Sequence, residues 1–195
     1  MKRSINFFVA LCAFVLIGNG AAAQQMQASA GLELAVPFVN WASFGVGLSG
    51  GFEYPVWEQI AATGQLGFEV MLAGSGPDGT SSASNIGMGF FQVGGKYYFQ
   101  DVQDGFYGQV QLGFHTGSQK FKYNEGTIYE STVKQSVGGA SWAIGGGYQM
   151  EKFDISARLN GVGGRRSVAS STYTYSYNSL FYFGIRVAYL IPVGS

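Results

Sequence analysis

The residue types that most often carry out catalysis are scarce in this chain. His115 is its only histidine, and Ser118 follows three positions later. A histidine that takes a proton from a serine is a common hydrolase pair, but residues three apart in an extended strand point to opposite faces. One histidine also excludes the usual multi-histidine metal sites. We therefore expect no catalytic residues, no bound metal and no cofactor.

Charged side chains form a second group with possible chemistry. Seven of them stand inside runs that alternate apolar and polar residues: Glu33, Glu53, Glu69, Lys96, Asp154, Arg158 and Arg186. The four carboxylates could be read as an acid/base cluster. They could also be partners of the three bases in a closed interior, because a buried charge is costly unless it is paired and hydrogen-bonded. We interpret the seven residues as a structural charge network.

A third motif is GVGLSG at residues 45–50, which fits the G-x-G-x-x-G pattern of dinucleotide-binding loops. That function needs a helix directly after the glycines, whose N-terminus holds the pyrophosphate. The sequence continues instead as GFEYPVW, which reads as a strand followed by a turn. The glycines are better explained by tight curvature and by large side chains that pack beside small ones.

The elements that position these residues are predicted to be strands. In FDISARLNG, residues 153–161, every second residue is apolar or glycine, which is the period-2 pattern of a strand with two unlike faces. Similar alternation recurs in eight segments: 27–37, 44–54, 59–73, 85–100, 105–117, 136–150, 152–163 and 178–191. A tilted membrane-spanning strand needs about 9–11 residues, so most of these segments are long enough to cross a membrane.

The connections between the segments differ in length. Those after the second, fourth and sixth segments are tight, at residues 55–58, 101–104 and 151–152. Those after the third, fifth and seventh are long and rich in Ser, Thr, Gly and Tyr, at residues 75–84, 118–136 and 164–177. Short turns at one rim and long loops at the other are typical of outer-membrane barrels.

Composition indicates which face of the strands meets water. Only 11% of the residues are charged and 16% are aromatic, whereas a typical soluble domain has about 25% charged residues. A Lys or Arg that faced lipid at the midplane would cost about 2–4 kcal/mol. The charged face is therefore predicted to line the interior. Eight strands enclose a space that side chains largely fill, so we expect no open pore.

Aromatic residues near the segment ends are predicted to form girdles at the two membrane interfaces, where an apolar ring with a polar tip fits. Phe38 and Trp41 are assigned to the long-loop end. The short-turn rim is assigned a larger set: Tyr97, Tyr98, Phe99, Phe106, Tyr107, Tyr148, Phe153 and Tyr189.

The first 23 residues have the order of a secretory signal peptide: Lys2 and Arg3, then an apolar stretch, then small residues that end at Ala23. Cleavage there leaves a single domain, residues 24–195, that lacks the only cysteine, Cys12, and therefore cannot form a disulfide or a thiolate site. It carries nine basic residues against eleven acidic ones. Such a balance does not favour nucleic acid as a partner.

Four stretches carry a resemblance to a known family: NIGMGFFQVGGKYYF, GFYGQVQLGFHTG, SWAIGGGYQMEKFDISARLNG and SLFYFGIRVAYLI. They resemble the small outer-membrane β-barrel proteins of Gram-negative bacteria, of the opacity-protein type. The resemblance implies an all-β, eight-stranded antiparallel up-and-down transmembrane barrel with short periplasmic turns and longer extracellular loops. It also implies the outer membrane as location, and outer-membrane lipid, lipopolysaccharide and the barrel-assembly machinery as partners.

The long loops are where a specific function is expected, because a rigid scaffold holds them out. Four basic residues there could pair with lipopolysaccharide phosphates: Arg165, Arg166, Lys120 and Lys122. The stretch SSTYTYSYNS, residues 170–179, alternates Tyr with small hydroxyl residues. It could be an adhesive hairpin, since Tyr supplies contact area at low entropy cost, or a strand extension above the membrane.

These observations lead to one main functional hypothesis and two alternatives. The main hypothesis is a non-enzymatic integral outer-membrane barrel that supports the envelope and displays loops for recognition or adhesion. The first alternative is an enzyme that modifies outer-membrane lipid, of the lipid A deacylase or acyltransferase type, some of which use a Ser–His pair in the barrel wall. The second is a secreted, soluble, lipocalin-like binding barrel, which would need its apolar face inside.

Overall fold

The computed structural model describes residues 26–74, 80–124, 126–163, 166–169, 174–177 and 179–193. The expected signal peptide, residues 1–23, lies outside the described residues. No helix in the described part of the chain is long and apolar enough to cross a membrane.

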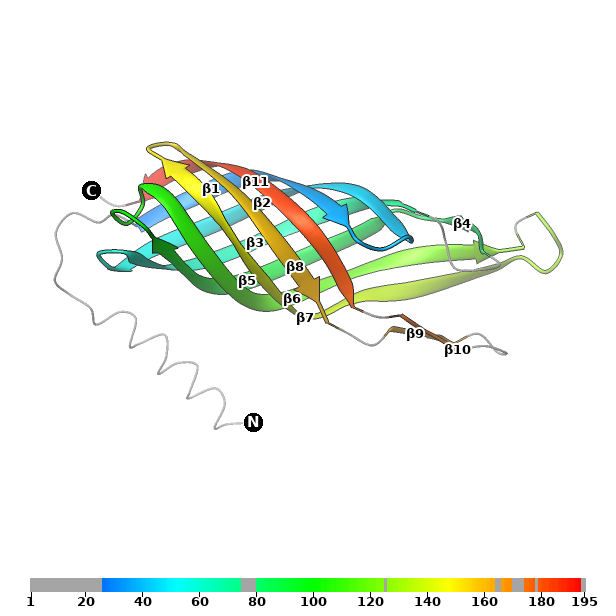
Figure 1. Ribbon diagram of the computed structural model, residues 1–195. Coiled ribbons are helices and arrows are strands. Elements are labelled where there is room, and N and C mark those ends of the chain that lie inside the picture. The colour runs from blue at the N-terminus through cyan, green and yellow to red at the C-terminus, as the bar shows by residue number, and fades with distance from the viewer. Residues whose placement is uncertain are drawn as a thin grey trace.

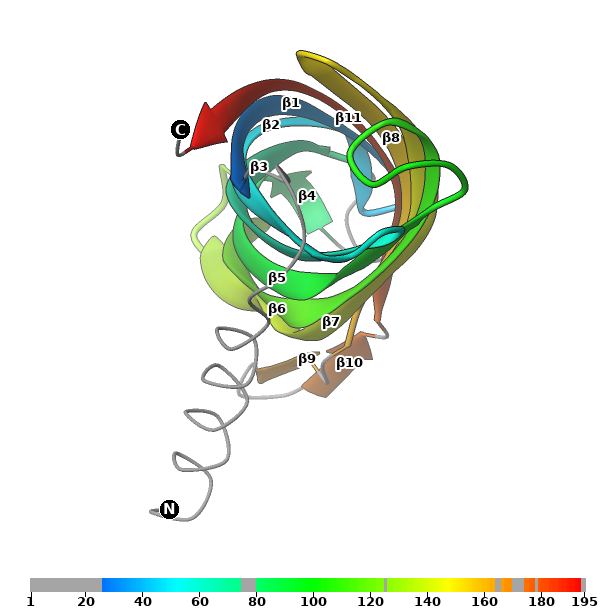
Figure 2. The same ribbon diagram turned by 90° about the vertical axis from the view of Figure 1, so that its left-hand side faces the viewer.

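Eight long strands form one closed antiparallel barrel (Figures 1 and 2). Each pairs with its neighbours in the chain, and the first and last strands pair along Met26 to Pro37 to close the cylinder. The up-and-down barrel predicted from the sequence is therefore confirmed. The strands are β1 (Met26–Pro37), β2 (Ala42–Trp57), β3 (Ile60–Ala73), β5 (Ile86–Tyr98), β6 (Gly105–Tyr123), β7 (Ser131–Met150), β8 (Phe153–Val162) and β11 (Leu180–Val193).

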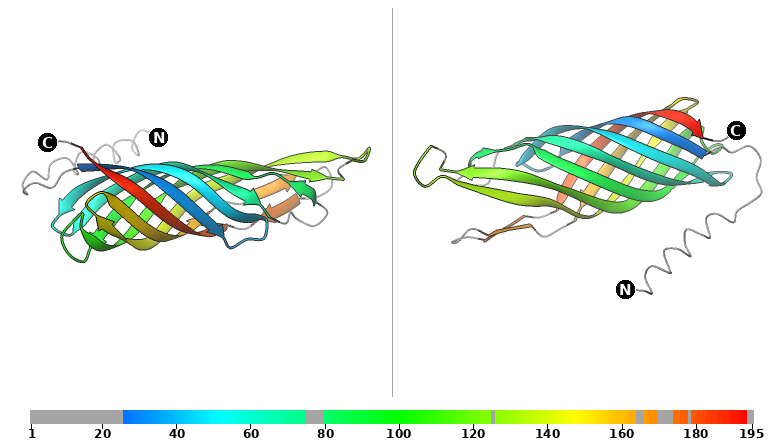
Figure 3. Two further views of the ribbon diagram at one scale, coloured as in Figure 1. Left: turned by 90° about the horizontal axis from the view of Figure 1, so that it is seen from above. Right: turned by 180° about the vertical axis from the view of Figure 1, so that it is seen from behind.

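The connections at the loop end contain more strand than the sequence predicted. β6 and β7 run on far past the barrel as a hairpin (Figures 1 and 3), so most of the expected loop 118–136 is paired strand. A short strand, β4 (Thr80–Ala83), pairs with β6, and β9 (Arg166–Ala169) pairs with β10 (Thr174–Tyr177). Pairing satisfies backbone N–H and C=O groups, which a long open loop must leave to water.

The turns at the opposite end, here called the short-turn rim, are tight. β7 and β8 are joined by Glu151 and Lys152, as predicted, and β5 and β6 by residues 99–104. The turn between β2 and β3 was predicted at residues 55–58, which is too early in the chain. β2 instead continues to Trp57 and turns at Glu58 and Gln59, with a register shift between Pro55 and Trp57. Bulges of this kind are where a sheet accepts proline.

The two faces of the barrel differ in polarity. In β8 burial alternates residue by residue, with Phe153, Ile155 and Leu159 exposed and Asp154, Ser156 and Arg158 buried. Leu48, Phe106 and Phe114 on other strands are each about two-thirds exposed, at 66%, 65% and 67%. The outside is thus apolar and the inside polar, which is the reverse of the lipocalin-like arrangement.

The aromatic assignments hold for most of the short-turn rim but not for all of it. Tyr97, Phe99, Phe106, Tyr148, Phe153 and Tyr189 are exposed on the outside, whereas Tyr98 and Tyr107 are buried inside the barrel. Neighbours along a strand point to opposite faces, so consecutive aromatic residues cannot all belong to one girdle. At the loop end, Phe38 is exposed, but Trp41 packs against the apolar cluster inside the mouth.

That apolar cluster fills the barrel at the loop end, and we call it the outer plug. Its members come from six different strands: Ala35, Ala42, Met71, Ile86, Met88, Val162, Leu180 and Tyr182. Val39 and Trp41 pack against it. A smaller apolar cluster, Ala61, Tyr98, Val102 and Tyr107, lies at the short-turn rim. The polar lumen lies between these two clusters.

Candidate functional site

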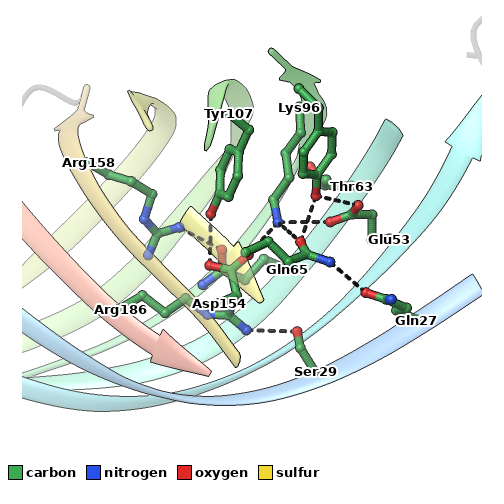
Figure 4. A network of polar contacts seen from close by, with 12 residues as sticks. Gln27, Ser29, Glu53, Thr63, Gln65, Lys96, Tyr107, Asp154, Arg158 and Arg186 are labelled. Atoms are coloured by element: carbon green, nitrogen blue, oxygen red, sulfur yellow. Dashed lines mark hydrogen bonds and ion pairs between the residues drawn. The ribbon is translucent and has the colours of Figure 1, made fainter. Parts of the chain in front are cut away.

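Nearest the short-turn rim, the lumen holds a group centred on Lys96, which we call the Lys96 cluster (Figure 4). Lys96 Nζ lies 2.8 Å from Glu53 Oε2 and 2.5 Å from Asp154 Oδ2. The Tyr107 hydroxyl donates to Asp154 Oδ1 over 2.8 Å, and the Tyr98 hydroxyl lies 2.6 Å from Glu53 Oε1. One buried ammonium group is thus shared by two carboxylates, and each carboxylate also accepts a tyrosine hydrogen bond, which reduces the cost of burying it.

Deeper in the lumen, Glu33 is the centre of a second group, the Glu33 cluster. Arg158 Nη2 donates to Glu33 Oε2 over 2.7 Å, and Arg186 Nε lies 3.3 Å from Glu33 Oε1. Gln65 Nε2 donates to the same carboxylate over 2.6 Å, and its Oε1 accepts from Arg158 Nη1. Arg186 also donates to Ser29 and Ser49. Here two cations share one acid, the converse of the Lys96 cluster.

Strand register explains why these side chains meet. Glu33 and Arg186 stand directly opposite each other at the β1–β11 seam that closes the barrel. Inward glycines leave the space that the long side chains occupy. A Cβ at Gly147 would lie 2.5 Å from the Tyr107 hydroxyl oxygen, and one at Gly47 would lie 2.7 Å from Glu69 Cγ. Large inward side chains thus pack beside inward glycines on neighbouring strands. This is the packing that we inferred for the glycines of residues 45–50.

The third level of the lumen, just below the outer plug, contains His115. Its Nε2 lies 3.0 Å from the Tyr182 hydroxyl oxygen, and its ring stacks on Phe90 with 5.3 Å between centroids. His115 is only 3% exposed. Ser118 is on the opposite face of β6, three residues on, so the structure does not bring the two together. The fourth predicted acid, Glu69, is also at this level and within electrostatic reach of Arg158 and Tyr182.

All seven residues of the predicted charge network are buried in the lumen, but sequence reasoning missed their uncharged partners. Gln65, Gln111 and Gln149 each hydrogen-bond at least one of the seven, and Tyr182 faces His115. The signal was present, since these residues have the inward parity of their strands. A lone glutamine or tyrosine is simply less conspicuous than a charge.

The lumen contains a small cavity near the Lys96 cluster. The cavity, partly open toward the short-turn rim, has a volume of about 30 Å³ and is lined by residues that include Gln27, Lys96, Gln109, Asp154 and Arg186. Such a volume accommodates about one or two water molecules. This cavity is too small for an organic substrate.

The hairpin of β6 and β7 carries the basic residues predicted to contact lipopolysaccharide. Lys120 is exposed and stands directly opposite the exposed Lys134, and Lys122 is two residues further along β6. All three share the outward face of β6 and β7 with Leu112 and Phe114, because positions two apart face the same way. Arg165 lies outside the described residues. Arg166 begins β9, and the description of that residue is limited to its backbone.

The described residues at the tip of this hairpin, 124 and 126–130, are linked by hydrogen bonds. The Asn124 carbonyl accepts from the backbone N–H and from the hydroxyl of Thr127, and Glu130 accepts from the N–H of Gly126. Asn124 and Gly126 have φ values of 52° and 79°, a region that suits these two residue types. Ile128 and Tyr129 are 92% and 75% exposed there. The hairpin therefore presents apolar side chains on an ordered support.

Comparison with known proteins supports the fold. No protein family model matches the chain, and no curated protein matches it. Among solved structures, the chain is similar to Ail, the attachment invasion locus protein of Yersinia pestis, at 11% identity and a TM-score of 0.56, over 87% of this chain and 100% of Ail. It is also similar to the N-terminal β-barrel domain of Pseudomonas aeruginosa OprF, at 15% identity and a TM-score of 0.50, over 85% of this chain and 97% of that domain.

Ail has also been solved in complex with the heparin analogue sucrose octasulfate, and that structure matches at 11% identity with a TM-score of 0.54, over 87% of this chain and 100% of Ail. At these identities the likeness concerns the fold alone. The chain has the eight-stranded fold of small outer-membrane barrels, which is what the resemblance in the sequence implied.

Proposed function

We propose that this protein is exported through its N-terminal signal peptide, residues 1–23, and inserted in the outer membrane. There it serves as a non-enzymatic barrel whose β6–β7 hairpin binds phosphate or sulfate groups of surface polysaccharide, lipopolysaccharide in the first place. The observation that carries the ligand proposal is the outward-facing pair Lys120 and Lys134, directly opposite each other on the extended hairpin. Barrel-assembly machinery is the expected partner during insertion.

The membrane location is supported by the outer surface of the barrel. Large apolar side chains are exposed on all eight long strands, among them Leu32, Leu48, Leu66, Val93, Phe114, Ile144, Ile155 and Ile185. Monomeric soluble proteins rarely expose contiguous apolar patches larger than a few hundred Å². A closed barrel also leaves no unpaired strand edge in the hydrocarbon, which is what a β-structure needs to span a bilayer.

The ligand class follows from the charges above this apolar surface. Like charges directly opposite each other on paired strands are destabilising, so the Lys120–Lys134 pair is costly without an anion and gains when one binds. Charge-assisted hydrogen bonds to phosphate or sulfate are stronger than neutral ones. The Ail complex with a sulfated sugar is a property of Ail, but it supports polyanionic saccharide as a ligand class that this fold can accommodate.

The test is a titration of the purified protein, in zwitterionic detergent, with lipopolysaccharide and separately with sucrose octasulfate. The double variant Lys120→Gln/Lys134→Gln is expected to bind both probes about 3- to 10-fold more weakly, since each exposed ionic contact contributes up to about 1 kcal/mol. Binding should weaken as salt rises. The matched control is Lys152→Gln, an exposed lysine at the short-turn rim, which should leave affinity unchanged.

Two results would separate the parts of this proposal. Equal affinity of the double variant and the wild type would refute the hairpin as the anion site. It would not affect the proposal that the protein is an outer-membrane barrel. The membrane location is tested independently, by fractionating the envelope and comparing boiled and unboiled samples on a detergent gel. A heat-shifted band in the outer-membrane fraction is expected, and a soluble protein without a shift would refute the location.

A further inference from the structure

We propose that the lumen binds a column of water that enters from the short-turn rim and ends below the outer plug, and that the outer plug is the barrier that keeps the barrel from conducting water. The inference depends on the barrel spanning a membrane. It does not depend on the ligand of the β6–β7 hairpin.

The first observation is a set of buried polar atoms that we call the polar ring. Six atoms have no hydrogen-bond partner among the described residues: Glu69 Oε2, Gln92 Nε2, His115 Nδ1, Ser141 Oγ, Arg158 Nε and Asn160 Nδ2. Each of these residues is at least nine-tenths buried. A buried polar group without a hydrogen-bond partner is destabilising, so six such atoms call for a bound partner.

Strand register places the polar ring in one part of the lumen. Gln92 and Ser141 both stand opposite Gly113 on β6. Gly113 has the same inward parity as its neighbour His115, so Gln92 and Ser141 flank it on the lumen side. Arg158 and Asn160 are two residues apart on β8, and Asn160 stands opposite Tyr182, the partner of His115. The ring therefore extends from the Glu33 cluster, with which it shares Arg158, toward the outer plug.

The chemistry of the ring suits water. Gln92, Asn160 and Arg158 offer N–H donors, Glu69 offers an acceptor, and His115 and Ser141 can do either. Water both donates and accepts, and a buried water typically makes about three hydrogen bonds. A bound anion would instead meet the Glu69 carboxylate, and a metal cation would meet Arg158. Neutral, amphoteric water satisfies the whole set.

The ring connects to the rim through polar surface. The cavity of about 30 Å³ opens toward the short-turn rim, and Gln65 and Gln111 line its inner side. Both glutamines also accept hydrogen bonds from Arg158, which belongs to the polar ring. The polar side chains that line this cavity therefore lead from the rim to Arg158, the first member of the ring.

The column ends at the outer plug. Met71, Ile86, Met88 and Leu180 are completely buried there, and the plug contains no charged residue. On the loop side of the plug, the Gln119 side chain donates to the carbonyls of Trp41 and Ser84, over 3.4 and 3.0 Å. These hydrogen bonds link β6 to two of the connections at the loop end. Apolar constrictions of this kind close a pore by excluding water.

The hydration step is tested on the wild-type protein in detergent micelles by NMR magnetisation transfer from water. Transfer is expected to the side-chain amide protons of Gln92 and Asn160, and not to the methyl groups of Met71 and Met88. Absence of transfer at both amides would overturn the water site. Equal transfer to the two methionine methyl groups would overturn the outer plug as the barrier. Because this measurement needs no substitution, it does not depend on whether a variant folds.

The barrier is tested by osmotic shrinkage of vesicles that contain the inserted protein, with insertion verified by the heat-dependent gel shift. Wild-type vesicles should shrink at the rate of protein-free vesicles, and Met88→Ala/Leu180→Ala should raise that rate. The control is Leu48→Ala/Leu112→Ala, which removes apolar side chains from the outer face of the barrel, leaves the plug intact and should match wild type. Shrinkage of the plug variant at the protein-free rate, with insertion verified, would refute the plug as the barrier.

Discussion

At the scale of single residues, the lumen is organised by charges that neutralise one another at contact distance. Lys96 pairs with both Glu53 and Asp154, and Glu33 pairs with both Arg158 and Arg186. Desolvation of such groups can cost as much as their attraction returns. The net contribution of such a pair to the free energy of folding is therefore small. Removing one partner is costly, because it leaves the other charge buried without a counter-ion.

Removing Lys96 should be strongly destabilising. Lys96→Met leaves two carboxylates buried without their cation, which is expected to cost about 3–5 kcal/mol of the free energy of unfolding. Denaturant unfolding in detergent micelles, followed by tryptophan fluorescence, measures this. Lys134→Met on the exposed hairpin is the control and should change stability by less than about 0.5 kcal/mol. Equal stability of the two variants would show that the Lys96 cluster is not what holds the lumen together.

Inward glycines should be intolerant of even one methyl group where a lumen side chain fills the space. A Cβ at Gly147 would lie 2.5 Å from both the Tyr107 hydroxyl oxygen and the backbone oxygen of Ile155, whereas a Cβ at Gly108 meets nothing within 4 Å. Gly147→Ala is expected to cost about 1–3 kcal/mol, and Gly108→Ala to be neutral or slightly stabilising. Thermal unfolding of both variants is the measurement, and a larger loss for Gly108→Ala would contradict the packing described.

Much of the site at residue scale could be predicted from parity, because alternation along a strand assigns each charged residue to one of its two faces. The partners of these residues could not be predicted in this way. Lys96 meets Asp154 across 58 positions of sequence, which depends on barrel closure and side-chain reach. Parity, applied strictly, would also have placed Tyr98 and Tyr107 inside rather than in the girdle.

At the scale of elements, each strand has an apolar outer face whose tolerance for charge should vary with depth. Leu112 and Ser118 share the outward face of β6, six residues apart. Leu112→Lys, amid exposed apolar neighbours, is expected to cost about 2–4 kcal/mol, and Ser118→Lys, beyond them, about 0–1 kcal/mol. Unfolding from lipid bilayers gives both values. Equal costs would indicate that lipid does not surround this strand where we place it.

The strands of the barrel wall were predictable because hydrophobic alternation and turn residues mark them directly. The β6–β7 extension was not, since its Ser, Thr, Lys and Gln content resembles a loop. Yet QKFKY, at residues 119–123, alternates polar residues with Phe121 and Tyr123, and Phe121 is buried. The pattern was present but short, and pairing with β4 and β7 decides its conformation.

At the scale of the whole molecule, closure and asymmetry follow from the order of strands and the lengths of their connections. Three turns at the short-turn rim are tight, while the β6–β7 hairpin, β4 and the β9–β10 hairpin all stand at the loop end (Figure 3). Outer-membrane barrels have short turns on the periplasmic side and longer loops outside the cell. We predict the same orientation for this protein.

Protease treatment of intact cells tests the orientation. The described residues at the tip of the β6–β7 hairpin, 124 and 126–130, are exposed, and the hairpin extends beyond the other strands of the barrel (Figure 1). Exposed loop tips are preferred sites of cleavage. A protease of broad specificity should therefore cut within residues 118–135 on intact cells and leave the turn at residues 99–104 whole until the envelope is opened. The cut barrel should keep its heat-dependent gel shift, since the tip is remote from the wall. First cleavage at residues 99–104 on intact cells would reverse the orientation and put the lysine pair of the hairpin in the periplasm, away from the polysaccharide we propose it binds.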